Sequence, residues 1–183
     1  MIKTFNQLID YLKNPILEKD KNQNLFYKFK ILLHLLVISI FTAALLTPLF
    51  GLINHFGWVD MDSHAMEKLL KKMSKTHVLL FAVIIAPLLE ELVFRAPITL
   101  FNHKKNFKIV FFTFAIIFGF IHLSNFEITT NVLLLAPVLV APQIILGGYL
   151  GFIRVRFGLI WSILLHASYN AFFVFSSFVA DLT

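Results

Sequence analysis

Two adjacent glutamates and an arginine interrupt an otherwise apolar stretch of the chain, which reads Pro87-Leu-Leu-Glu-Glu-Leu-Val-Phe-Arg-Ala-Pro97. Glu91 and Arg95 are four residues apart, so on a helix they share one face and can form an ion pair. Glu90 lies about 100° further round the helix axis and is expected to point elsewhere. One carboxylate is then neutralised, and the other remains available for acid–base chemistry.

Two other apolar stretches carry side-chain pairs at the same four-residue spacing. Phe118 and His122 close one stretch, and His166 and Asn170 lie inside another. An imidazole can take up and release a proton near neutral pH, and an amide can donate a hydrogen bond to a developing oxyanion. Each pair also has a plainer interpretation. A histidine near a membrane surface often contacts headgroups, and a polar pair in an apolar helix can simply join two helices.

The elements that must position these side chains are apolar helices. Of the 183 residues, 58% are hydrophobic and only 14% are charged, whereas soluble domains carry about 25% charged residues. This composition excludes a disordered chain, a nucleic-acid-binding domain and an ordinary soluble enzyme. The chain has no cysteine, which excludes disulfides and thiolate chemistry. We therefore predict an all-α fold, a polytopic bundle of transmembrane helices.

Five apolar segments are long enough to span a membrane, which takes about 20 helical residues. They cover residues 31–54, 77–101, 107–123, 131–153 and 158–180. Residues 1–30 are polar and basic with a helical apolar pattern, which predicts an amphipathic segment before the first span. The first loop contains a second amphipathic stretch over 62–75, which we expect to form an interfacial helix. The core that carries the polar pairs covers residues 77–180.

The distribution of basic residues predicts the orientation of the chain. With five spans, the segments on the N-terminal side of the membrane hold eleven Lys and Arg residues, and the opposite segments hold four. Basic residues gather in cytoplasmic loops, so we expect residues 1–30 to be cytoplasmic. The abundance of Lys, Asn, Ile and Phe is typical of AT-rich bacterial genomes, and we expect a multi-pass protein of a bacterial plasma membrane.

The charged turn of the second span raises the free energy of inserting that segment into a bilayer. Three charged residues cost about 8–10 kcal/mol at a helix centre, whereas the Leu, Ile, Val and Phe residues of the same segment return about 4–8 kcal/mol. The segment must therefore face partner helices or a wet cavity, and its ionisable residues are candidates for function. The plainer alternative is that these residues only staple helices together.

Several other residues are given structural interpretations. Pro87 frees a backbone carbonyl in the second span, because proline has no N–H to donate. Arg154 and Arg156 are interpreted as cytoplasmic anchors after the fourth span. Small residues in that span form a close-packing surface, made by Gly147, Gly148 and Gly151.

The polar residues of three spans read Glu-Glu-x-x-x-Arg, Phe-x-x-x-His and His-x-x-x-Asn in chain order. Together they resemble the CAAX protease and bacteriocin-processing (CPBP, or ABI) family of intramembrane endopeptidases, over about residues 77–175. The resemblance implies a site in a cavity between helices. It also implies hydrolysis of a peptide bond in a membrane-embedded or lipidated substrate. The implied catalytic residues are Glu90, Glu91, His122, His166 and Asn170, with structural support from Arg95 and Phe118.

Water is the expected nucleophile, since cysteine is absent and no serine has a recognisable base motif beside it. Glu90 is our choice of general base. We expect Arg95 to hold the second carboxylate in place. We expect Glu91 to help orient the water and His122 to transfer its proton. His166 and Asn170 are expected to donate hydrogen bonds to the oxyanion.

Other chemistries and classes are kept as alternatives. A metal-dependent route would use Zn²⁺ held by Glu91, His122 and His166, whereas the preferred route needs no cofactor. A non-catalytic bacteriocin-immunity or membrane interaction protein would keep the same fold. An ion-coupled transporter is weakened by the lack of an inverted repeat. No strand precedes the glycines of the fourth span, so a nucleotide fold is excluded, and we expect no nucleic acid or nucleotide partner.

Overall fold

The computed structural model describes residues 1–61, 72–100 and 106–180, and every regular element in these ranges is helical. Five helical segments within the described ranges are long and apolar enough to cross a membrane. They cover Leu25–His55, Lys75–Thr99, Phe107–Asn125, Thr130–Phe157 and Leu159–Ala180. These findings confirm the predicted all-α, polytopic fold. Most of the interfacial helix expected over 62–75 lies outside the described residues.

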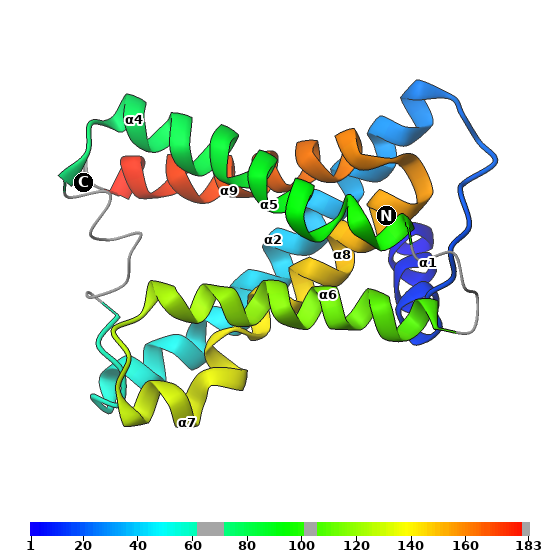
Figure 1. The fold of residues 1–183 in the computed structure, drawn as a ribbon. Coiled ribbons are helices and arrows are strands. Elements are labelled where there is room, and N and C mark those ends of the chain that lie inside the picture. Colours follow the sequence, from blue (N-terminus) through cyan, green and yellow to red (C-terminus); the bar gives the residue numbers. More distant parts are fainter. Residues whose placement is uncertain (62–71, 101–105, 181–183) are drawn as a thin grey trace.

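The amphipathic segment at the N-terminus forms helix α1 (Ile2–Lys13), which runs across the end of the bundle (Figure 1). Its buried residues Thr4 and Leu8 face the protein. The Thr4 hydroxyl is 2.8 Å from Nδ1 of His34 on α2 (Leu25–His55). Lys108 donates a hydrogen bond of 2.8 Å to the carbonyl of Lys13. The helix is therefore attached to the bundle by its buried side chains and by these hydrogen bonds.

The second span is built from four short elements rather than one regular helix. They are α4 (Lys75–Leu79), the π-helical η1 (Leu80–Ile85), α5 (Ala86–Phe94) and the 3₁₀ turn η2 (Pro97–Thr99). The N–H of Ala86 bonds to the carbonyl of Phe81, five residues earlier. In the same register the carbonyl of Ala82 would need the N–H of residue 87, which is proline and has none. Pro87 therefore leaves the carbonyl of Ala82 without a partner in its own helix.

Helices α6 (Phe107–Ile121) and α8 (Ala141–Phe157) form the closest antiparallel pair of the bundle. A Cβ on Gly147 would lie 3.3 Å from the backbone of Ala115, and a Cβ on Gly151 would lie 2.5 Å from the ring of Phe111. These glycines let the two backbones approach. Two of the three glycines of the predicted close-packing surface, Gly147 and Gly151, therefore face α6, whereas Gly148 faces Leu12 of α1.

The fourth span is broken at Val140 into α7 (Thr130–Leu139) and α8. The sequence predicted one segment over 131–153 and a polar link over 154–157. The structure instead continues the helix to Phe157, so that Arg154 and Arg156 belong to its last turn. Gly158, with φ of 106°, provides the left-handed residue that ends α8, and α9 (Leu159–Ala180) follows.

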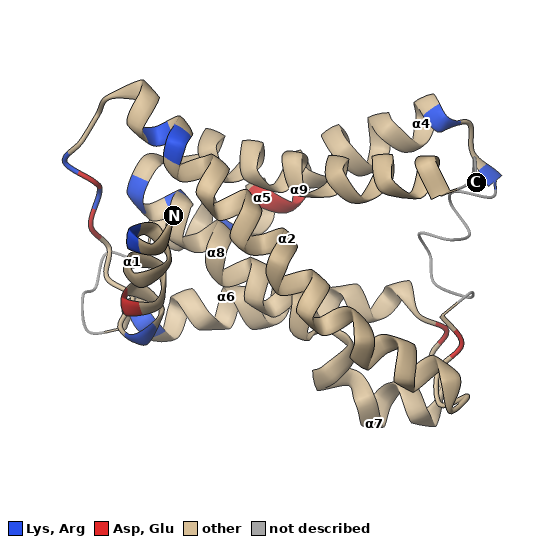
Figure 2. Ribbon diagram, turned by 180° about the vertical axis from the view of Figure 1, so that it is seen from behind, with Lys and Arg blue, Asp and Glu red and all other residues tan. Residues whose placement is uncertain are grey.

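Far from α1, the bundle divides into two groups of helices (Figure 1). Val78 and Ala82 pack with Val174 of α9 in one apolar cluster. The end of α2 and α7 share a separate cluster that includes Ile53 and Val132. Helix α5 contacts both α6 and α9. Lys and Arg gather around α1 and the neighbouring helix ends, as Figure 2 shows.

Candidate active site

Helices α5 and α9 and the end of α6 bring one glutamate and two histidines together in the interior of the bundle. Glu90 Oε2 lies 3.8 Å from Nε2 of His122 and 3.8 Å from Nε2 of His166. His122 begins the 3₁₀ turn η3 (His122–Asn125) directly after α6. The acidic turn of α5 is visible in the middle of the ribbon in Figure 2. Three of the five predicted catalytic side chains therefore converge, although they come from separate spans.

Glu91 is part of a fully buried network behind this cluster. Its Oε1 lies 3.7 Å from Nε of Arg95 and 3.0 Å from Nδ1 of His166. The pairing of Glu91 with Arg95 was predicted from their spacing and is confirmed. Glu90 points away from that ion pair, as its position about 100° further round the helix predicted, and toward the Nε2 atoms of the two histidines. The two carboxylates contact opposite nitrogens of the same imidazole, because residues about 100° apart on α5 reach round both edges of the His166 ring.

Phe118 supports both the arginine and the histidines. The guanidinium of Arg95 lies 3.8 Å above the centre of the Phe118 ring, which is a close cation–π contact. The same ring meets the imidazoles of His122 and His166 edge-on, with centroids 4.8 Å and 5.8 Å apart. Because Phe118 is completely buried, its ring supports the Arg95 guanidinium and the two imidazoles in fixed positions around it.

Hydrogen bonds at Nδ1 determine which nitrogen of each histidine faces Glu90. His122 Nδ1 is 2.7 Å from the carbonyl of Phe118, and His166 Nδ1 is 3.0 Å from the Glu91 carboxylate. A carbonyl and an ionised carboxylate can only accept, so both Nδ1 atoms donate. In the neutral imidazoles both Nε2 atoms then carry a lone pair toward Glu90. Acceptors 3.8 Å apart can be bridged by one water with hydrogen bonds of about 2.8 Å.

The site is more open on one side than on the other. Glu91 and His166 are 0% and 3% exposed, whereas Glu90 and His122 are 28% and 19% exposed. Oε2 of Glu90 and both Nη atoms of Arg95 are buried without a hydrogen-bond partner among the described residues. Access to the cluster therefore comes from the Glu90–His122 side.

Asn170 is placed differently from the expected oxyanion donor. Its Nδ2 donates a hydrogen bond of 2.8 Å to the carbonyl of Ala82. This is the carbonyl that Pro87 leaves without a partner in the π-helical turn. The observed contact therefore joins α9 to the second span, and one N–H of the amide remains for another acceptor.

The donor atoms of the site do not have the spacing that a zinc ion needs. The expected set of Glu91, His122 and His166 does not converge, since Glu91 contacts His166 at Nδ1, on the far edge of the ring. Glu90 with the two Nε2 atoms is the set that fits by donor type, and partners at Nδ1 are usual for zinc-binding histidines. Tetrahedral zinc places such ligand atoms about 3.3 Å apart. At the observed separations, no three side chains of the described residues are close enough to hold a metal ion.

Three residues at the site were not predicted from the sequence. Arg154, interpreted as an anchor, donates hydrogen bonds to the end of α5. Gly147 leaves room for Arg95, since a Cβ there would lie 3.3 Å from Nη2. Ser162 is completely buried on α9, where its hydroxyl donates a hydrogen bond of 2.9 Å to the carbonyl of Leu159. Only Ser162 had a local signal, because it lies four residues before His166 on the same helix face.

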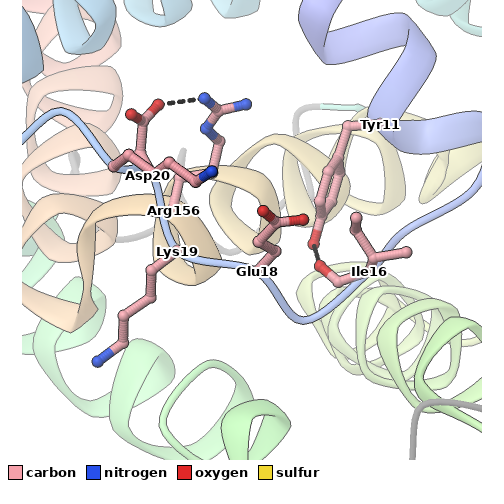
Figure 3. A pocket seen from close by; sticks show the side chains of 7 residues that line it. Tyr11, Ile16, Glu18, Lys19, Asp20 and Arg156 are labelled. Atoms are coloured by element: carbon pink, nitrogen blue, oxygen red, sulfur yellow. Dashed lines mark hydrogen bonds and ion pairs between the residues drawn. The ribbon is translucent and has the colours of Figure 1, made fainter.

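A separate hollow of about 340 Å³ lies at the basic end of the bundle, where residues 16–21 cross the end of α8 (Figure 3). Arg156 forms an ion pair with Asp20 there, and the hydroxyl of Tyr11 donates to the carbonyl of Ile16. Its lining contains no histidine. The hollow is therefore separate from the site where Glu90, His122 and His166 meet.

The fold and this site define a polytopic membrane protein with a glutamate–histidine centre enclosed by its helices. A family model described as Type II CAAX prenyl endopeptidase Rce1-like matches residues 72–172, more than half of the chain. The chain belongs to this family of membrane proteases, which confirms the predicted resemblance. All seven residues carried over from the resemblance lie in the matched range. No curated protein and no solved structure matches the chain significantly.

Proposed function

We propose that the protein hydrolyses a peptide bond of a membrane-embedded or lipidated polypeptide, using a water molecule that Glu90 activates. The observation that carries this proposal is the approach of Glu90 Oε2 to the Nε2 atoms of His122 and His166, at 3.8 Å each. Such a group of acceptors suits a water that donates its protons and turns its own lone pair toward a substrate carbonyl.

The reaction proceeds in two steps. In the first, the water oxygen bonds to the carbonyl carbon while Glu90 takes one of its protons, which leaves a tetrahedral oxyanion. In the second, the carbon–nitrogen bond breaks, and the same proton passes to the leaving nitrogen, directly or through Nε2 of His122. Glu90 ends the cycle as a carboxylate, and the water is divided between the two products.

The oxyanion is stabilised from the α9 side. His166 can donate to the oxyanion through Nε2 when its ring is protonated, and the Glu91 carboxylate at Nδ1 holds the ring in place. Arg95 in turn holds Glu91 on its other side. The second N–H of Asn170 is our candidate for a further donor. Removing one donor of this kind typically costs about 3–4 kcal/mol of transition-state stabilisation.

The proposal includes the orientation of the chain in the membrane. Basic residues gather at the α1 end of the bundle (Figure 2), which supports a cytoplasmic N-terminus in a bacterial plasma membrane. The alternatives of a bacteriocin-immunity protein or an ion carrier predict no new protein termini in the membrane.

The test compares protein termini in membranes of cells that express the wild type, Glu90→Gln or Glu18→Gln. Glu18 lines the separate hollow of Figure 3, so Glu18→Gln is a matched control for loss of one carboxylate. We expect new termini in membrane proteins with the wild type and the control, and none with Glu90→Gln at equal expression. Identical sets of termini in all three samples would overturn the proposal. Termini that disappear only after chelation, with Glu90→Gln still active, would overturn the glutamate mechanism.

A further inference from the structure

The C-terminal end of α5 is held by a side chain from a distant helix. Helix α5 ends at Phe94, and Pro97 follows three residues later, so the last carbonyls of the helix need partners from elsewhere. Arg154 of α8 provides them. Its Nε donates to the carbonyl of Arg95 at 3.0 Å, and its Nη2 donates to the carbonyl of Ala96 at 3.4 Å.

The same guanidinium also reaches the turn that follows α5. Nη2 of Arg154 donates to Oγ1 of Thr99 at 2.7 Å, and the Thr99 hydroxyl donates to the carbonyl of Ala96 at 3.4 Å. The planar fork of Arg154 therefore connects three acceptors on one end of the span. A lysine ammonium lacks this fixed geometry, although it carries the same charge. A cation at this place is also favourable to the helix dipole.

Helix α8 contacts Arg95 at a second point, about two turns earlier on the same helix face. Gly147 lies seven residues before Arg154, so the two residues share a helix face. The open space above Gly147 takes the Arg95 guanidinium, whose Nη2 lies 3.3 Å from where a Cβ would be. Helix α8 therefore holds the backbone of Arg95 through Arg154 and accommodates its side chain at Gly147.

We propose that Arg154 is a positioning residue for the catalytic site, and this rests on the proposed function. Its hydrogen bonds fix the backbone from which the Arg95 side chain extends. The Arg95 guanidinium pairs with the Glu91 carboxylate, which in turn accepts from Nδ1 of His166. A shift at the end of α5 is passed through these contacts to the imidazole that faces Glu90. Misplacement of a catalytic group by about 1 Å can lower turnover by about a hundredfold.

The test measures kcat, KM and the melting temperature of reconstituted variants with an internally quenched, prenylated peptide of the CAAX type. We expect Arg154→Lys to lower kcat by about tenfold or more, with KM and melting temperature close to those of the wild type. Arg156→Lys is the matched control two residues away, because Arg156 pairs with Asp20 and not with α5. It should leave kcat unchanged.

A second pair of variants tests the acceptor. Thr99→Val removes Oγ1 and should lower kcat severalfold, whereas Thr99→Ser keeps the acceptor and should retain the wild-type value. A merely structural role would lower the melting temperature of Arg154→Lys and Thr99→Val in parallel with their activity. Unchanged kcat in Arg154→Lys, or equal kcat in Arg154→Lys and Arg156→Lys, would overturn the inference. Wild type and Glu90→Gln in the same assay show separately whether the proposed function itself fails.

Discussion

Asn170→Ala is expected to destabilise the protein by an amount that depends on Pro87. The Asn170 amide donates to the carbonyl of Ala82 at 2.8 Å. No N–H of the second span replaces it, because the N–H of Ala86 bonds to Phe81 and residue 87 is proline. A buried acceptor without a donor costs about 1–3 kcal/mol. Asn170→Ala should therefore lower the free energy of unfolding by about this amount.

Pro87→Ala supplies the missing donor. The new N–H at residue 87 can bond to the Ala82 carbonyl in the π-helical register, or Ala86 can do so if the turn becomes α-helical. In this background the cost of Asn170→Ala should fall by about 1 kcal/mol or more. Reversible unfolding of the wild type, both single variants and the double variant in mixed micelles measures the difference.

The activity of the same four proteins separates the two roles of Asn170. If the amide also donates to the oxyanion, the double variant remains slow even when its stability is restored. If the amide only supports Ala82, activity returns together with stability. An equal loss of stability on Asn170→Ala in both backgrounds would refute the reasoning, since it would mean that Pro87 does not create the need for this hydrogen bond.

Two further predictions concern packing and pH. Gly147→Ala should lower the free energy of unfolding by about 1–3 kcal/mol and lower activity, because its Cβ would lie 3.3 Å from the backbone of α6 and from Arg95 Nη2. Gly148→Ala is the control, because its Cβ would meet only the end of a side chain on α1. In thermal unfolding the control should be nearly neutral. Burial would raise the pKa of Asp20, but the ion pair with Arg156 and a backbone N–H lower this pKa below its ordinary value of 3.8. The ion pair should therefore add about 1 kcal/mol of stability above about pH 4, and this stability is lost as the pH falls further. Melting temperatures of the wild type and Asp20→Asn should therefore converge at acid pH, and a constant difference down to pH 3 would contradict this.

The parts of the site that sequence alone could predict are the local ones. Glu91 and Arg95 pair because a four-residue spacing places both on one helix face whatever surrounds them. The apolar spans follow equally from local hydropathy. The meeting of Glu90, His122 and His166 depends on how three spans pack, which spacing does not determine. The resemblance of their order to a known family is what predicted it.

The remaining differences come from tertiary contacts. Arg154 lies at a helix end, where the positive-inside rule favours an anchor, and only the position of α5 shows that its fork holds another helix. Pro87 indicated a free carbonyl, but its identity depended on the π-helical register, which places it at Ala82 rather than one residue later. The spacing predicted that Glu90 lies off the Glu91–Arg95 face, but one helix could not show that the imidazole of His166 lies between the two carboxylates.

The central claim is that Glu90 activates the water that cleaves the substrate, and one comparison tests it most directly. The initial rate of cleavage of a quenched prenylated peptide should be measured for the reconstituted wild type, Glu90→Gln and Glu90→Asp, with and without a chelator. The account predicts a rate lower by about a hundredfold or more for Glu90→Gln, partial activity for Glu90→Asp, and no effect of the chelator on the wild type. A Glu90→Gln rate within a few fold of the wild type would contradict it.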